Sequence, residues 1–106
     1  MAKGFDPAEM MQQARRMKEQ ISKAQEKLKD RVVEGEAGGG LVKAYVNCGK
    51  EVVGIKLKPD VVDPQDLSML EDLIMVAVNN GLKRAAQIEE EEMNKLTGGM
   101  GLGGLL

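Results

Sequence analysis

An uninterrupted heptad pattern runs from Met10 to Leu28 of this 106-residue chain. Asp6 is a suitable N-cap and Pro7 a suitable first helical residue, and no other proline or glycine occurs between Pro7 and Gly35. The apolar positions alternate in steps of four and three, and they are Met10, Ala14, Met17, Ile21, Ala24 and Leu28. This spacing predicts a helix over about residues 7–31 with one apolar seam.

The predicted helix is long for so small a chain. At ~1.5 Å per residue it spans roughly 37 Å, whereas a compact domain of about 100 residues has a radius of gyration near 13 Å. We therefore expect it to extend beyond its own sheet, where its seam needs a second chain to cover it. The pattern predicts a homodimer with the six seam residues in the interface.

Apolar and polar residues then alternate with period two as far as Pro59. The alternation predicts a meander of three antiparallel strands, at about residues 32–37, 40–48 and 51–58. The face expected to be buried collects Val33, Gly35, Ala37, Val42, Ala44, Val46, Cys48, Val53, Ile55 and Leu57. The face expected to meet water carries Glu34, Glu36, Lys43, Tyr45, Asn47, Lys56 and Lys58.

A second helix is predicted over about residues 64–96. Asp63 fits an N-cap, Pro64 fits the first helical position, and Asp66 fits an acid in the first turn. Gly81 lies in the middle of this pattern and costs about 1 kcal/mol relative to Ala. Either the helix breaks near residues 79–81 or a neighbouring backbone packs closely there, and we favour close packing.

These elements predict an α+β fold, an α-β-β-β-α subunit with a three-stranded antiparallel sheet and two long helices. Residues 1–97 are expected to form one domain, followed by a flexible glycine-rich tail at residues 98–106. The chain has no run of ~20 apolar residues and no signal region. Its single cysteine, Cys48, suits a reducing compartment. We expect a soluble cytoplasmic protein with no membrane partner.

The four glycines of residues 35–40 invite comparison with phosphate-binding loops. A P-loop continues with Lys and Ser or Thr, but Leu41 and Val42 stand at those positions. No helix is predicted to follow, so the helix dipole that favours phosphate is missing as well. We interpret the glycines as a hairpin turn.

The composition argues against an enzyme. The chain has no histidine, which excludes acid–base, triad and metal schemes that need an imidazole. Cys48 alternates inward and is interpreted as a core residue. Residues 89–92 are four consecutive glutamates that fan out around a helix, as in a solvated face. We predict no catalytic residue, metal, cofactor or small-molecule substrate.

Charge is unevenly distributed in a chain whose net charge is −2. Residues 1–31 carry eight Lys or Arg against five acids, whereas residues 59–106 carry three against nine. Two basic stripes flank the seam of the first helix, one with Arg16, Lys23 and Lys27 and the other with Arg15, Lys18 and Lys29. They fit either ordinary coiled-coil flanks or cationic edges that contact DNA phosphates. Lys83, Arg84 and Lys95 are a weaker alternative.

The amino-acid sequence of the chain resembles that of the YbaB/EbfC family of bacterial nucleoid-associated proteins. The resemblance covers essentially the whole chain and rests on several segments. They are the first helix MMQQARRMKEQISKAQEKL, the turn and strand with Gly35, Gly38, Gly40 and Val42, the block from Leu70 to Leu73, and Thr97 to Met100.

This resemblance implies a tweezers-like homodimer that binds double-stranded DNA and shapes the nucleoid. Because the sequence lacks aromatic platforms and an evident recognition helix, we expect weak sequence specificity. The six cations of the two stripes are the predicted DNA contacts. The alternative is a dimeric helical module that binds another protein and has no direct role on DNA.

Overall fold

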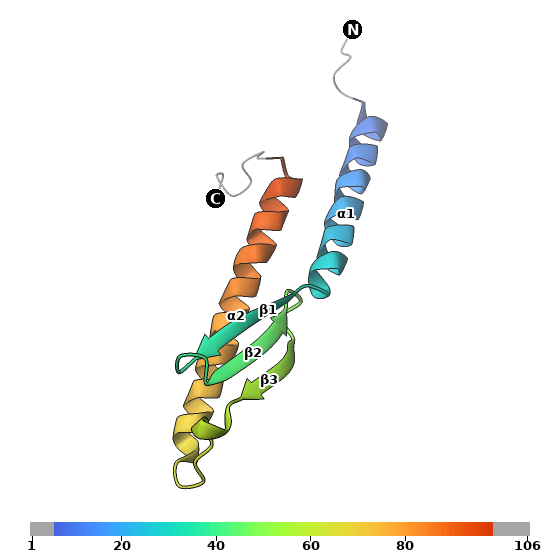
Figure 1. Cartoon of the computed structure of the whole chain (residues 1–106). Coiled ribbons are helices and arrows are strands. Elements are labelled where there is room, and N and C mark those ends of the chain that lie inside the picture. The colour runs from blue at the N-terminus through green and yellow to red at the C-terminus, as the bar shows by residue number, and fades with distance from the viewer. Residues whose placement is uncertain (1–5, 99–106) are drawn as a thin grey trace.

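The computed structural model describes residues 6–98, in which one helix precedes a three-stranded sheet and projects from its end, and a second helix follows the sheet and packs against it (Figure 1). In chain order the elements are α1 (Pro7–Lys29), β1 (Val32–Ala37), β2 (Val42–Asn47), β3 (Val52–Leu57), the short 3-10 helix η1 (Pro59–Val61) and α2 (Leu67–Leu96). The predicted α+β class and α-β-β-β-α order are confirmed. Of the tail expected to be flexible at residues 98–106, residues 99–106 lie outside the described residues.

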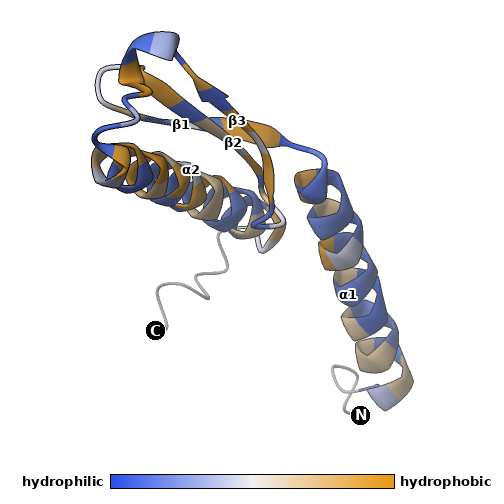
Figure 2. Cartoon of the chain, turned by 90° about the horizontal axis from the view of Figure 1, so that it is seen from below, coloured by the Kyte–Doolittle hydropathy of each residue, from blue (hydrophilic) through white to orange (hydrophobic). Residues whose placement is uncertain are grey.

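The three strands form an antiparallel meander in the order β1-β2-β3. Gly35 of β1 pairs with Ala44 of β2, and Ala44 pairs in turn with Ile55 of β3. α2 packs across β1 and β2, and its apolar side turns toward the strands (Figure 2). The core therefore lies between one helix and the first two strands.

Burial on β1 and β2 follows the predicted alternation except at Asn47. Val42, Ala44 and Val46 of β2 have no exposed surface. Two clusters join these strands to α2: one contains Leu28, Val33, Val46, Cys48 and Ala85, and the other contains Ala37, Val42, Ala44, Val61 and Ala77. Leu28, the buried residue of α1, connects the end of that helix to the first cluster.

α2 continues without a break through Gly81. A Cβ atom at this position would lie 3.1 Å from Cγ2 of Val46 and 3.4 Å from the backbone nitrogen of Gly35. Close packing of a neighbouring backbone, rather than a break in the helix, therefore explains the glycine. The preferred interpretation of the sequence is confirmed.

The start of α2 differs from the prediction. The helix begins at Leu67 with Asp66 as its N-cap, whose side chain accepts the N–H of Met69 at 3.2 Å. Asp63 instead closes a preceding turn, in which its carboxylate accepts the N–H of Gln65 at 2.9 Å. Asp63 and Asp66 lie within four residues, and each can act as the N-cap of a helix. Because Pro64 suits the first helical position, the local pattern favoured Asp63, which is not the cap of α2.

The expected burial of β3 was wrong. Val53, Ile55 and Leu57 are 54%, 42% and 37% exposed. A helix with its side chains is about 10 Å across, and neighbouring strands lie ~4.8 Å apart. A single helix centred over β1 and β2 therefore leaves β3 uncovered. These three residues form an exposed apolar surface, called here the β3 face.

Asn47 was expected to face water but is 8% exposed. Its side-chain oxygen accepts the N–H of Glu51 at 3.0 Å, and its amide nitrogen donates to the Glu51 carboxylate at 3.3 Å. These bonds tie the two ends of the β2–β3 turn together. Burial of the polar Asn47 side chain, which the period-two pattern did not predict, costs free energy, and these local hydrogen bonds offset that cost.

α1 projects from the body and approaches α2 at its C-terminal end (Figure 1). The Cα radius of gyration of 20.5 Å is well above the ~13 Å of a compact chain of this length. Met10 and Met17 of the heptad seam are 49% and 41% exposed, and Ala14 is exposed too. Ile21 and Ala24 are half-buried and Leu28 is buried. Most of the seam is thus left uncovered by its own protomer.

Candidate nucleic-acid interface

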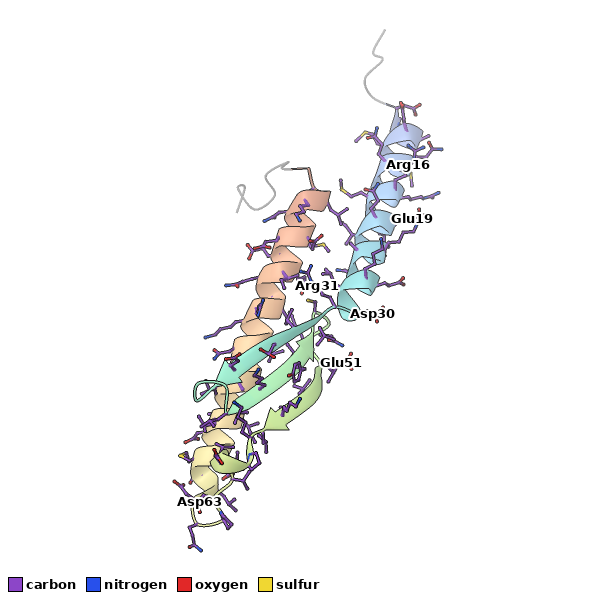
Figure 3. All side chains as sticks on the ribbon, viewed as in Figure 1. Arg16, Glu19, Asp30, Arg31, Glu51 and Asp63 are labelled. Atoms are coloured by element: carbon purple, nitrogen blue, oxygen red, sulfur yellow. The ribbon has the colours of Figure 1, made fainter. Side chains whose placement is uncertain are left out.

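The six cations predicted to contact DNA all lie on the surface of α1: Arg15, Arg16, Lys18, Lys23, Lys27 and Lys29 are exposed. The helix that carries them begins as predicted at Pro7, where the Asp6 carboxylate accepts the N–H of Ala8 at 3.0 Å. Figure 3 shows the side chain of Arg16 far out along this arm. The outer part of the arm holds Arg15, Arg16 and Lys18 away from the acidic second half of the chain, whereas the inner part approaches the end of α2.

A cleft of about 580 Å³ lies between the C-terminal ends of α1 and α2. Its charged lining consists of Lys23 and Lys27 from α1, Arg31 from the link to β1, and Glu92 and Lys95 from α2. Ala24, Leu28 and Leu96 supply its apolar lining. Four cations face one carboxylate, so the cleft favours anions.

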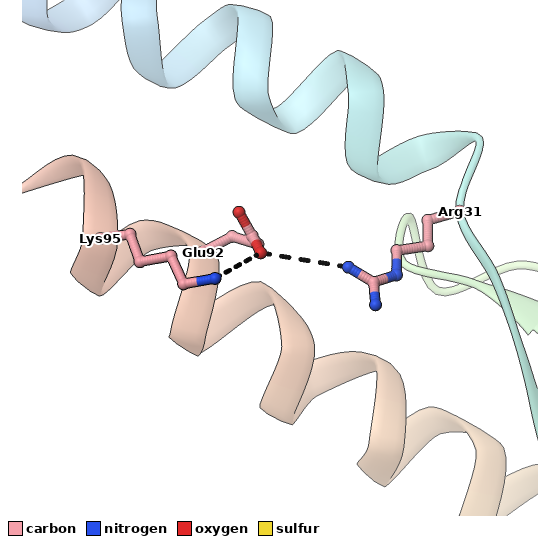
Figure 4. Close-up of polar contacts among 3 residues, drawn as sticks. All are labelled: Arg31, Glu92 and Lys95. Atoms are coloured by element: carbon pink, nitrogen blue, oxygen red, sulfur yellow. Dashed lines mark hydrogen bonds and ion pairs between the residues drawn. The ribbon is translucent and has the colours of Figure 1, made fainter.

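Glu92 is the carboxylate at the centre of this cluster (Figure 4). Its Oε1 atom lies 4.0 Å from Nη1 of Arg31 and 3.4 Å from Nζ of Lys95. The three side chains are between 37% and 73% exposed, so water and salt screen both pairs. Each pair contributes at most about 1 kcal/mol to stability.

The structure separates the two basic stripes in part. Lys23 and Lys27 of the first stripe turn into the cleft, whereas Arg16 lies beyond it. In the second stripe, Arg15 and Lys18 line a shallow groove on α1 together with the acids Glu19 and Glu26, and Lys23 of the first stripe borders this groove as well.

Lys29, the last member of the second stripe, lies beside the β2–β3 turn and lines a hollow there with Lys50 and Glu89. The second stripe is therefore interrupted by carboxylates and divided between two surfaces. The first stripe leads into the electropositive cleft.

The sequence-based prediction missed Arg31. It follows Lys23 and Lys27 at the same spacing of four residues and lay within the predicted helix of residues 7–31, but it was not assigned to either stripe; α1 ends at Lys29, and Arg31 lies in the link to β1. Lys95 was named only as part of a weaker alternative with Lys83 and Arg84. Those two residues are exposed on α2 but do not line the cleft.

Other kinds of site find little support in residues 6–98. No group of three or more His, Cys, Asp or Glu in this part of the chain could hold a metal ion. Cys48 is buried, and desolvation raises the pKa of its thiol, while Arg31 opposes this shift and Glu89 adds to it. The raised pKa keeps Cys48 a thiol rather than a nucleophilic thiolate.

The glycine loop is a hairpin turn, as predicted. Gly38, Gly39 and Gly40 have φ angles of 63°, 67° and 92°, and the strand β2 follows directly. A phosphate loop would lead into the N-terminus of a helix instead.

No helix within residues 6–98 is long and apolar enough to cross a membrane.

Comparisons with known proteins agree with the sequence resemblance. The profile of the YbaB/EbfC DNA-binding family matches residues 3–100. A nucleoid-associated protein of Thermoanaerobacter pseudethanolicus is 48% identical over 102 residues, which cover 96% of this chain and 92% of the relative. A nucleoid-associated protein of Chloroflexus aurantiacus is 46% identical over 92 residues, covering 87% and 92%.

A solved structure has a similar fold. The crystal structure of an uncharacterized protein from Helicobacter pylori superposes with a TM-score of 0.76 at 22% sequence identity. The match covers 88% of this chain and 98% of that one. At this identity the likeness supports the arrangement of helices and strands.

Proposed function

Because this chain belongs to the YbaB/EbfC DNA-binding family, we propose that it binds double-stranded DNA as a homodimer and helps to organise the bacterial nucleoid in the cytoplasm. The observation that carries the proposal is the projecting arm α1, whose exposed cations continue into the cleft beside α2. A chain with a net charge of −2 has no general attraction for DNA. Its affinity must come from such a local concentration of positive charge.

The proposed contacts are made to the phosphate backbone. Lysine and arginine side chains along an exposed helix neutralise phosphates without reading the bases. The chain contains one Tyr, one Phe and no Trp, so it offers no row of aromatic side chains for stacking on single-stranded bases. We therefore expect duplex DNA to be bound with little sequence specificity and its conformation to be altered by the pair of arms.

The proposed homodimer would cover apolar surface that one protomer leaves in water. Within residues 6–98, such surface includes the outer part of the α1 seam, with Met10 and Met17, and the β3 face, with Val53, Ile55 and Leu57. Exposed apolar surface of this kind is typical of an interface. A dimer doubles the number of cations that one DNA molecule can meet.

Titration of a short mixed-sequence duplex at two salt concentrations tests the proposal. Log K should fall by roughly 0.9 for each phosphate contact per tenfold increase in salt. The exposed seam of α1 also suits a second function, the binding of an amphipathic helix from another protein. Such a partner buries apolar surface and should respond little to salt. Absence of duplex binding at low salt would contradict the proposed function.

A further inference from the structure

The cleft between α1 and α2 holds an internal anion. Glu92 comes from near the end of α2, and it reaches Arg31 and Lys95 with one and the same carboxylate oxygen. Lys23 and Lys27 line the same cleft, and neither has an ion pair within 4.0 Å among residues 6–98. One carboxylate thus stands among four cations, in the position that an external anion would take.

We propose that this cleft is a phosphate site of the DNA-binding surface and that Glu92 fills it when DNA is absent. A backbone phosphate then replaces Glu92 as the partner of Arg31 and Lys95. The inference rests on the proposed function, since it assumes that duplex DNA is the ligand. It adds Arg31 and Lys95 to the contacts and gives Glu92 the role of an internal competitor.

The contacts of Glu92 are of the kind that a phosphate can displace. Their N–O distances of 4.0 Å and 3.4 Å exceed the 2.7–2.9 Å of well-formed charge-assisted hydrogen bonds. Both cations remain more than half exposed, with side-chain accessibilities of 54% for Arg31 and 73% for Lys95. An incoming phosphate can therefore reach them without moving the core.

A phosphate also suits this cluster better than a carboxylate does. The planar guanidinium of Arg31 can bind two phosphate oxygens side by side, and Lys95 can act as a point charge beside it. Lys23 and Lys27 lie one helical turn apart on α1 and can contact neighbouring phosphates of the same strand. The cleft then joins the arm α1 and the end of α2 into one binding surface.

The decisive variant is Glu92→Gln, which removes the charge and retains the shape and helix propensity of the side chain. Fluorescence anisotropy with a short mixed-sequence duplex should show affinity about two- to fivefold higher than the parent, because a negative charge beside the phosphate is gone. Glu90→Gln is the matched control. It makes the same change of charge two residues away on α2, at an exposed position outside the cleft lining. It should raise affinity less.

A second pair of variants separates local competition from overall charge. Arg31→Gln with Lys95→Gln should weaken binding and flatten the salt dependence by nearly two units of slope. In that background the gain from Glu92→Gln should fall to that of Glu90→Gln, since the carboxylate no longer occupies Arg31 and Lys95 and only the general effect of one fewer negative charge remains. All variants should retain the melting temperature of the parent within a few degrees, because every altered side chain is at least partly exposed.

The possible results distinguish this inference from the function on which it rests. If the parent binds no duplex, both fail. If the parent binds DNA with a steep salt dependence but Glu92→Gln matches Glu90→Gln, the function stands and the inference is overturned. A Glu92→Gln gain that still exceeds the Glu90→Gln gain without Arg31 and Lys95 would overturn it as well.

Discussion

Gly35 of β1 and Gly81 of α2 pack backbone against backbone. A Cβ atom on Gly35 would lie 2.8 Å from Cα of Gly81, and still closer to the backbone nitrogen of Gly81 and the carbonyl oxygen of Ala77. Real side chains do not reach such distances, and backbone atoms cannot move aside as a flexible side chain can. The pair sets how closely α2 lies on the sheet.

Gly35→Ala should destabilise the fold strongly, by about 3 kcal/mol, because the methyl group forces the helix and the strand apart. Urea unfolding followed by circular dichroism measures the loss as a lower midpoint. Gly54→Ala is the control, since a Cβ there meets only Tyr45 at 3.5 Å, an ordinary contact. Equal stability of the two variants would contradict the close packing.

Gly39 offers a clean test of the turn interpretation. Its φ is +67°, and no atom lies within 4 Å of a Cβ built on it, so a substitution changes backbone strain without adding a clash. Gly39→Ala should cost about 1–2 kcal/mol, and Gly39→Asn should cost less because Asn adopts this conformation more readily. The melting temperatures of the two variants, compared with that of the parent, show which substitution costs more stability. Addition of ATP should leave the melting temperature of the parent unchanged, and a rise would revive the phosphate-loop interpretation.

Ile55→Glu should weaken the proposed dimer, by at least roughly tenfold in its dissociation constant, because an unpaired carboxylate would be buried against the partner. Ile55 is 42% exposed in one protomer, so the variant should still fold. Sedimentation velocity reports the shift toward monomer. Lys56→Gln, the next residue along β3, is the control and should remain dimeric.

The heptad seam needs its own test. Ile21→Glu should also shift the sedimentation toward monomer if the seam lies in the interface as the sequence predicts. A parent protein that is monomeric at micromolar concentration would contradict the prediction that either the α1 seam or the β3 face forms a dimer interface. If Ile21→Glu remains dimeric while Ile55→Glu does not, the β3 face holds the protomers together and the α1 arms stay free.

Removal of one basic stripe at a time tests the DNA contacts on α1. Arg16, Lys23 and Lys27 are changed together to Gln, and Arg15, Lys18 and Lys29 are changed together in a second protein. Each triple variant should bind duplex DNA more weakly, and its salt slope should flatten by nearly three units if all three phosphate contacts are lost. Lys83→Gln with Arg84→Gln on α2 is the control. If both triple variants are folded dimers and bind like the parent, the contacts lie elsewhere.

Local features of the sequence were enough to predict the order of the elements. The heptad spacing, the Asp6-Pro7 cap and the alternation in residues 32–47 are properties of neighbouring residues, and each specifies its own helix or strand. The same holds for the glycine turn, because the left-handed conformation depends on a few adjacent residues. The start of α2 was missed by three residues because Asp63 and Asp66 can both cap locally.

The tertiary structure decided which apolar residues are covered and which cations meet. Ile55 continues the inward face of the sheet by its register with Ala44, yet it stays exposed because one helix is wide enough for two strands. Arg31 and Lys95 come close because α2 runs back toward the end of α1. Periodicity assigns a residue to a face of its own element. The distance between two elements depends on how they pack, and local periodicity does not contain it. The cleft between α1 and α2, with Glu92 at its centre, could therefore be found only in the tertiary structure.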